Sequence, residues 1–558
     1  MNLRTGKQFY LLFLCMLCVS VSKMSFAEPL YETILEDMKA RSDVIPKVPN
    51  VHPIHTVYNR EAVIPPQCYT KTEGRYNPCY VCHQDAIAGR ENVMNDGALQ
   101  KAYSFSDTGL TNHWKNLFED RSDRISRISD EQILQWVRED NYSILADRLK
   151  QANFKGWIPD LKKLEQADKA FDNEGFALDN SHWVAFNYKP MPSTFWPTNG
   201  ATDDVMIRLP ESFRTNSKGE YSREIYKANL TILEASIKGV SEIDSLPIDE
   251  KKIQVDLNQD NKLGVVNRIS ATHQYVGAAK GIYMEPTLYP EDTEFLHTVR
   301  YLDVKADGSI GISTRMKEVR YMRKWRFYNR QLYARKYELE SFEKDAGNLP
   351  GYQSLGNLGL DNGNGWAIQS FLEDRHGQLR ASTYEENFFC MGCHNSIGST
   401  IDKTFSFARK MDGAKGWGYI NLKGMPDAPN QGEQQGEIVT YLQRVGGGSE
   451  FRNNDEMRAR WFNTDGSLNR DALAQARDVY DLITPSKARA LELNKAYKVI
   501  VDDQDYIFGR DATLKPPQNV YSKVNNESAP TLTDEHIFKW DIRLDWSDTQ
   551  SRQAGLLP

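Results

Sequence analysis

The chain has 558 residues, 40% of them hydrophobic, and carries 69 Lys and Arg against 76 Asp and Glu, for a formal net charge of −7. This length and composition exclude a disordered or collagen-like polymer and predict about two to four domains. The acidic balance argues against an electrostatic nucleic-acid binder, for which a clearly basic domain is expected.

Residues 1–27 predict a secretory signal peptide that is cleaved after Ala27. A basic start precedes the apolar stretch 11–19, and Ser25 and Ala27 supply small residues at the two positions that a signal peptidase recognises. A membrane anchor needs about 20 apolar residues, whereas this apolar run ends at Val21.

The same segment does not predict a lipid anchor. A lipoprotein signal needs a small residue immediately before the modified cysteine, but Leu14 and Leu17 precede Cys15 and Cys18. Cleavage removes three of the 69 basic residues and none of the 76 acidic ones, so the mature chain has a net charge of −10. Because no later stretch is apolar enough to span a membrane, we predict a periplasmic or secreted protein.

The first cysteine pair lies in the loop-rich sequence Cys79-Tyr80-Val81-Cys82-His83. Further along, Ser129 and Gln132 predict a capping box at the start of an amphipathic helix. The apolar positions of this helix follow the i, i+3, i+4 spacing of a buried face: Ile133, Trp136 and Val137. We assign residues 28–200 to a first domain.

Residues 201–345 are predicted to form a middle region of mixed α/β structure, because 306 residues lie between His83 and the second cysteine pair. Asp256, Asn258 and Asp260 occupy positions 1, 3 and 5 of a calcium-loop pattern. Position 12 is Asn267 rather than a bidentate glutamate, so we favour a solvated acidic turn over a structural calcium ion in this segment.

Two segments predict β-hairpins. Residues 297–314 contain two β-branched runs joined by an Asp-Gly turn, and residues 366–382 have a turn at His376-Gly377. Residues 315–336 interleave nine Lys and Arg with aromatic residues, which indicates either a solvated basic face or donors for buried carboxylates. The last part of the chain is mostly helical in pattern, notably residues 471–497.

The second cysteine pair reads Cys390-Met391-Gly392-Cys393-His394 and repeats the CxxCH spacing of the first. Two thiols three residues apart can each form a thioether with a vinyl group of one porphyrin, and the adjacent histidine can bind the iron as proximal ligand. Three other interpretations are structural disulfides, a thioredoxin-like redox pair and one four-cysteine zinc site. None of them requires the histidine, so we favour two covalent haem c groups.

Both motifs resemble the haem-attachment sites of c-type cytochromes, and the helix after residue 129 is similar to the terminal helix of small class I cytochromes. This resemblance implies a mainly α fold of cytochrome c-like haem domains with β-hairpin insertions in the middle region. Residues 346–558 would then form the C-terminal haem domain. A weaker similarity, limited to two CxxCH motifs in one exported chain, links the protein to dihaem cytochrome c peroxidases, in which the motifs lie much closer together.

The resemblance also suggests distal iron ligands. A methionine followed by proline often supplies the sixth ligand in class I cytochromes, which favours Met425 for the second haem, with Met411 as its rival. For the first haem we favour His113, and its rivals are His52, His55 and Met94. The remaining thiol, Cys68, is either a buried unreactive cysteine or one half of an intermolecular disulfide.

These features predict an exported dihaem protein that accepts electrons from one redox partner and passes them to another. An acidic surface favours a partner with a basic docking patch, with association that slows as salt rises. The alternative is a haem-dependent oxidoreductase similar to the dihaem peroxidases, in which one haem stores an electron and the other reduces peroxide. The coordination of each iron distinguishes the two, since an enzyme needs an open position.

Overall fold

The computed structural model describes residues 57–84, 89, 97–101, 103, 105–192, 195–395 and 401–547. The predicted signal peptide lies outside the described residues, and so do three of the rival iron ligands: His52, His55 and Met94. Within the described ranges, no helix is long and apolar enough to cross a membrane.

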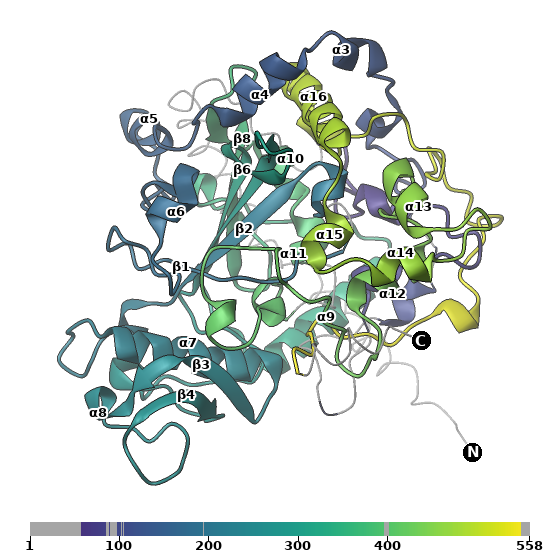
Figure 1. Ribbon diagram of the computed structural model, residues 1–558. Helices are drawn as coiled ribbons and strands as arrows, with labels where there is room; N and C mark the ends of the chain where they lie inside the picture. The colour runs from purple at the N-terminus through teal and green to yellow at the C-terminus, as the bar shows by residue number, and fades with distance from the viewer. Residues whose placement is uncertain are drawn as a thin grey trace, which may run out of the picture.

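A seven-stranded antiparallel sheet forms the centre of the molecule (Figure 1). Its order is β1-β2-β5-β6-β8-β7, and β9 also pairs with β8. The strands are β1 (Val184–Ala185), β2 (Thr202–Arg208), β5 (Glu294–Val304), β6 (Ile310–Lys324), β7 (Leu360–Asp361), β8 (Trp366–Glu373) and β9 (Leu379–Ala381). A smaller sheet pairs β3 (Glu242–Asp249) with β4 (Val265–Ser270).

Helices surround this sheet. They are α3 (Ser122–Ser126), α4 (Asp130–Arg138), α5 (Leu145–Gln151), α6 (Ala167–Ala170), α7 (Arg223–Lys238), α8 (Glu250–Ile253), α9 (Arg330–Asp345), α10 (Tyr384–Phe388), α11 (Met391–His394), α12 (Glu437–Val445), α13 (Asp455–Trp461), α14 (Arg470–Ala474), α15 (Val479–Ile483) and α16 (Lys487–Asp503). The predicted capping box of Ser129 and Gln132 begins α4, which packs on β5, β6 and α16. In Figure 1, α7, α8, β3 and β4 lie together at the lower left, and α16 runs beside α4.

The prediction of a mainly α fold is wrong. The structure is 33% helix and 17% strand, and the strands belong to one large sheet. The two predicted hairpins exist, as β5–β6 and β8–β9, but they belong to that sheet and are not insertions: β5, β6 and β8 are central strands, and β9 pairs with β8 at the edge. The sheet also takes strands from all three predicted domain ranges, since β1 precedes residue 200 and β8 follows residue 345.

Alternating side chains divide the sheet into two faces. One face carries residues such as Leu296, Val319 and Phe371, which pack into an apolar cluster with residues 142–185. The opposite face carries Phe295, His297 and Val299 of β5 and their counterparts on the neighbouring strands. This second face is the floor on which the candidate site is built.

A buried carboxylate beside the sheet makes stability depend on pH. Glu373 ends β8 fully buried, accepts a hydrogen bond from the Tyr301 hydroxyl (2.6 Å) and pairs with Arg315 (Oε1 to Nη1, 3.0 Å). Burial raises the pKa of Glu373 to about 7, although Arg315 opposes the shift. The folded state therefore holds a proton that the unfolded chain releases above its ordinary pKa of 4.5, so the free energy of unfolding falls as pH rises from about 4.5 to about 7.

We expect the free energy of unfolding of Glu373→Gln to fall by about 3 kcal/mol less than that of the wild type over this pH range, since each pKa unit corresponds to about 1.4 kcal/mol. Urea unfolding of wild type and variant at pH 5 and pH 8 measures the difference. Glu527→Gln, an exposed position, is the control and should keep the wild-type pH dependence. An unchanged pH dependence in Glu373→Gln would show that Glu373 ionises normally in the folded state.

Candidate functional site

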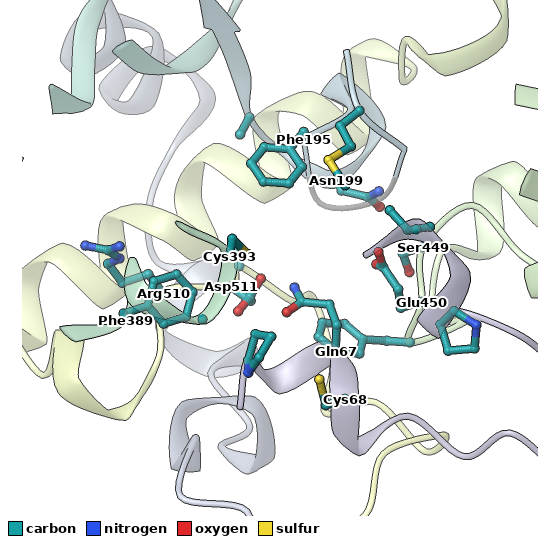
Figure 2. A pocket seen from close by; sticks show the side chains of 18 of the residues that line it. Gln67, Cys68, Phe195, Asn199, Phe389, Cys393, Ser449, Glu450, Arg510 and Asp511 are labelled. Carbon is teal, nitrogen blue, oxygen red and sulfur yellow. The ribbon is translucent and has the colours of Figure 1, made fainter. Parts of the chain in front are cut away.

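A cavity of about 1590 Å³ lies on the second face of the sheet. Pockets for a single drug-sized ligand usually measure about 300–1,000 Å³, so this one has room for a larger occupant. Its lining includes all six predicted haem-anchoring residues: Cys79, Cys82, His83, Cys390, Cys393 and His394. The fold thus brings together two motifs that lie far apart in the sequence. Figure 2 shows side chains from several segments, among them Cys68, Cys393, Glu450 and Arg510, around one space.

The two CxxCH motifs adopt the same local turn. In the first, the backbone N–H of His83 donates to the carbonyl of Cys79 (2.8 Å), and in the second the N–H of His394 donates to the carbonyl of Cys390 (3.1 Å). Residues three and four apart share one side of such a turn. Each turn therefore directs two thiols and the following imidazole toward the cavity.

Neighbouring residues hold both turns in place. A 3₁₀ helix (Cys79–Val81) follows Pro78, and the Asn77 side chain accepts a hydrogen bond from the N–H of buried Tyr80 (3.0 Å). Before the second motif, Thr383 and Glu386 form a capping box that begins α10, and α10 leads directly into Cys390 and α11. The Asn77 side chain thus holds the start of the first motif, and the capped helix α10 holds the start of the second.

The His394 ring is held in one tautomer. Its Nδ1 lies 2.8 Å from the carbonyl oxygen of Lys403, and a carbonyl only accepts, so Nδ1 carries the proton and Nε2 keeps its lone pair. Burial lowers the pKa of His394 to about 4, which keeps the ring neutral at pH 7. Metal-binding histidines usually donate their other N–H to a carbonyl or carboxylate in this way. The His394 side chain therefore has the form of a metal ligand.

The cavity also gathers every cysteine that the structure describes. Cys68 lines it together with the four motif cysteines, and none of the five forms a disulfide. Burial raises the pKa of the Cys79 thiol to about 12 and that of Cys393 to about 11, so both are protonated at neutral pH. Among the described residues, no three His, Cys, Asp or Glu side chains are close enough together to hold a metal ion.

Charged side chains cover the sheet floor of the cavity. His297 on β5 lies beside Asp203 on β2, with 3.2 Å between Nε2 and Oδ2. On β6, Arg320 donates to Glu318 (Nη2 to Oε2, 2.8 Å), and Arg510 approaches the same carboxylate at 3.5 Å. Although burial raises the pKa of Glu318, the two guanidinium groups lower it to about 2. Arg320 belongs to the basic stretch 315–336 and lines the cavity.

The two predicted distal ligands are not among the residues that line the cavity. Met425 is buried where its carbonyl accepts from the N–H of Val479. His113 lies edge-on to Tyr58, with 5.2 Å between the ring centroids. His297 lines the cavity instead, although in the sequence it marks only the start of a hairpin.

The side chains of the predicted calcium loop accept hydrogen bonds from its own backbone. The side-chain oxygens of Asp256 and Asn258 accept hydrogen bonds from the backbone N–H of Asp260, at 3.2 and 3.1 Å. Asp260 itself accepts from the N–H of Lys262 at 2.8 Å. The three side chains thus cap the loop's own backbone.

Comparisons with known proteins identify a family to which the chain is similar. A family model described as a "-like lipoprotein" matches residues 51–480. An uncharacterized lipoprotein of Aquifex aeolicus (strain VF5) is 31% identical over 515 residues, which cover 82% of this chain and 86% of the relative. No solved structure matches the chain.

These matches overturn the resemblance to c-type cytochromes and to dihaem peroxidases, because the family that matches is described as a lipoprotein. The error has a physical reason: a five-residue motif specifies one turn and leaves the surrounding fold undetermined. The family therefore gives no support for haem binding, iron binding or electron transfer. The geometry of the cavity is the only remaining argument for these properties.

Proposed function

Since the chain belongs to this lipoprotein family and is therefore exported, we propose a function for it outside the cytoplasm. The proposed function is to bind two haem groups covalently in one cavity and to transfer electrons between redox partners. The observation that carries this proposal is the convergence of both CxxCH motifs on a single cavity.

The side chains in the cavity fit covalent haem. Each motif supplies two protonated thiols for thioether bonds and one histidine for the iron, and His394 is already neutral and oriented. Arg320 Nε and Arg452 Nη1 are buried without a hydrogen-bond partner in the described part of the chain. Both arginines line the cavity, so these donors can bind the propionate carboxylates of a haem.

When bound, each haem supplies one-electron iron chemistry, and the protein contributes binding, orientation and electrostatics. Cys79, Cys82, Cys390 and Cys393 would hold the two porphyrins, and His83 and His394 would bind the irons. Because both motifs line the same cavity, the two haems would share one chamber, and electrons could pass between them inside the protein.

A second candidate function is peroxide reduction at one iron. The observation that favours it is the polar floor, where His297, Asp203 and Arg320 offer acid–base and charge-stabilising groups next to the cavity. This reaction needs an iron with an open or easily vacated position. Exposure of the purified protein to peroxide and carbon monoxide, followed by absorption spectroscopy, distinguishes the two functions.

We propose a periplasmic rather than a secreted location, because a lipid anchor of the kind that the family description implies would hold the protein at the membrane surface. The candidate anchor residues, Cys15 and Cys18, follow leucines and lie outside the described residues. Mass spectrometry of the mature N-terminus separates an acylated cysteine from a chain cleaved after Ala27.

The haem count tests the proposal. We expect two covalent haems per chain in the wild type, one in Cys79→Ala/Cys82→Ala and one in Cys390→Ala/Cys393→Ala, because each pair anchors its own porphyrin. Pyridine-haemochrome spectra and the mass of the denatured chain give the stoichiometry. Cys68→Ala is the matched control and should keep both haems. An unchanged stoichiometry in the double variants, or haem that dissociates on denaturation, would contradict covalent attachment at these motifs.

A further inference from the structure

Helix α9, in the lower half of the view in Figure 1, carries an apolar stripe on its outer side. The stripe consists of Leu332, Leu339 and Phe342, which are 37%, 58% and 69% exposed. Their spacing of seven and three residues places them on one face of the helix. Among the described residues, Phe342 is the most exposed large apolar residue. Adjacent apolar side chains in water usually mark a contact with a membrane or with another protein.

The opposite face of α9 fixes the helix to the protein. The buried Tyr333 hydroxyl donates to the Asp402 carboxylate (2.6 Å), and the ring packs against Leu288. At the start of the helix, Arg330 donates to the Thr287 hydroxyl (Nη2 to Oγ1, 3.1 Å). The helix is therefore already packed through its inner face, and the core does not need the three side chains of the stripe.

Side chains typical of a membrane interface lie around the stripe. Arg335 and Glu338 are exposed on the same side of α9. An arginine can keep its apolar stem among lipid chains while its guanidinium reaches the headgroups. Beside α9, the exposed Tyr283 ring contacts Phe327 (6.1 Å between centroids), which packs against the cluster of Tyr333. Tyrosine is enriched at membrane–water boundaries, so the surroundings of the stripe suit such a boundary.

A lipid surface is the occupant that these observations favour. The chain belongs to a lipoprotein family, and a lipid anchor holds a protein close to a membrane without selecting the face that meets it. The stripe residues project from the outer side of a helix, and none of them lines the cavity. A fluid lipid surface accepts such a projecting stripe directly, whereas a protein partner would have to supply a complementary groove.

We propose that α9 docks on the membrane surface, with Leu332, Leu339 and Phe342 inserted among the lipids and Arg335 at the headgroups. This inference rests on the periplasmic location proposed above and goes beyond it by assigning the face that meets the membrane. Residues 347–350 directly follow α9 and line the cavity. Docking through α9 therefore places this part of the cavity wall close to the lipid.

Flotation with mixed vesicles of phosphatidylethanolamine and phosphatidylglycerol tests the assignment. The haem-loaded chain that begins at Glu28 carries no acyl group, so its own surface must bind the vesicles, and we expect it to float. Leu339→Glu/Phe342→Glu should lower the vesicle partition coefficient at least about tenfold, because the new carboxylates would have to leave water. Leu339→Trp/Phe342→Trp, which keeps the stripe apolar, should float at least as well as the wild type.

The matched control is Leu178→Glu/Val265→Glu, which alters two equally exposed apolar residues outside α9 and should float like the wild type. A wild-type chain that stays with the soluble fraction, or a Leu339→Glu/Phe342→Glu variant that floats unchanged, overturns the assignment. Sedimentation velocity examines the other occupant, a second copy: a dimer that only this variant dissociates, without flotation of the wild type, also overturns it.

The proposed location and the proposed function have separate measurements. An acylated N-terminus together with a non-acylated chain that does not float would leave the periplasmic location intact and remove only the docking role of α9. A mature chain recovered from the culture medium would contradict the location instead. The haem count does not depend on α9, so Leu339→Glu/Phe342→Glu should keep both haems whichever result flotation gives.

Discussion

Asp402→Ala is expected to lower the free energy of unfolding by about 3–5 kcal/mol, the usual effect of removing one partner from a buried ion pair. The Asp402 carboxylate is fully buried and pairs with the ammonium group of Lys324, at the end of β6. It also accepts hydrogen bonds from the Tyr333 hydroxyl (2.6 Å) and the backbone N–H of Tyr289 (2.8 Å). These partners come from three separate segments, so one carboxylate joins β6, α9 and the chain before β5.

The free energy of unfolding falls because Lys324 is left without its counter-ion in Asp402→Ala. Burial alone lowers the pKa of Lys324, and Asp402 is the carboxylate that opposes this effect most strongly. In Asp402→Ala the ammonium must either remain charged without a counter-ion or lose its proton, and both cost free energy. The Tyr333 hydroxyl and the backbone N–H of Tyr289 lose an acceptor as well.

Urea unfolding followed by circular dichroism measures this loss. Arg268→Ala is the matched control, because it removes an ion pair with Glu242 and Asp244 whose side chains are more than half exposed, and it should cost no more than about 1 kcal/mol. Asp402→Asn keeps the shape of the side chain and should fall between the two. A loss below that of Arg268→Ala would mean that Asp402 does not hold these segments together.

Electron exchange with a basic redox protein is expected to slow about 10- to 1,000-fold as ionic strength rises from about 0.01 M to about 1 M. The mature chain carries a net charge of −10 when residues 1–27 are removed, so its field accelerates encounters with a positively charged partner. The range of this field shrinks from about 30 Å to about 3 Å between the two salt concentrations.

Stopped-flow mixing with a basic and an acidic redox protein of similar potential measures the effect. The acidic partner is the control: its rate should rise with salt, because screening removes the repulsion between like charges. A rate that is independent of salt with the basic partner would place docking on an uncharged part of the surface. The proposed electron transfer would then need a different kind of partner.

Local features of the fold could be predicted from the sequence, whereas the sheet could not. The capping box of Ser129 and Gln132 and both hairpins depend on residues close together in the chain, and they form as expected. Strand β2 is buried along nearly its whole length and carries Asp203 and Asp204 near its start, so it lacks the alternation that identifies a strand. Its pairing with β5 joins residues almost 100 positions apart, which no local pattern specifies.

Some residues of the candidate site could likewise be predicted from the sequence, and others could not. The six CxxCH residues could be identified because their chemistry depends on spacing within five positions, and all six line the cavity. His297 could not, because period-two alternation shows that it shares a face with Phe295 without showing which face meets a cavity. The proline after Met425 favours it as a ligand, but that local pattern says nothing about the packing of its backbone against Val479.

The cavity is walled by segments from both ends of the described chain, from Glu61 to Asn519. The first motif and residues 510–519 are therefore walls of the same chamber although more than 400 positions separate them in the chain. Such contacts require a long loop of chain to close before they form. The chamber is thus complete only after the N-terminal and C-terminal parts of the described chain have packed together.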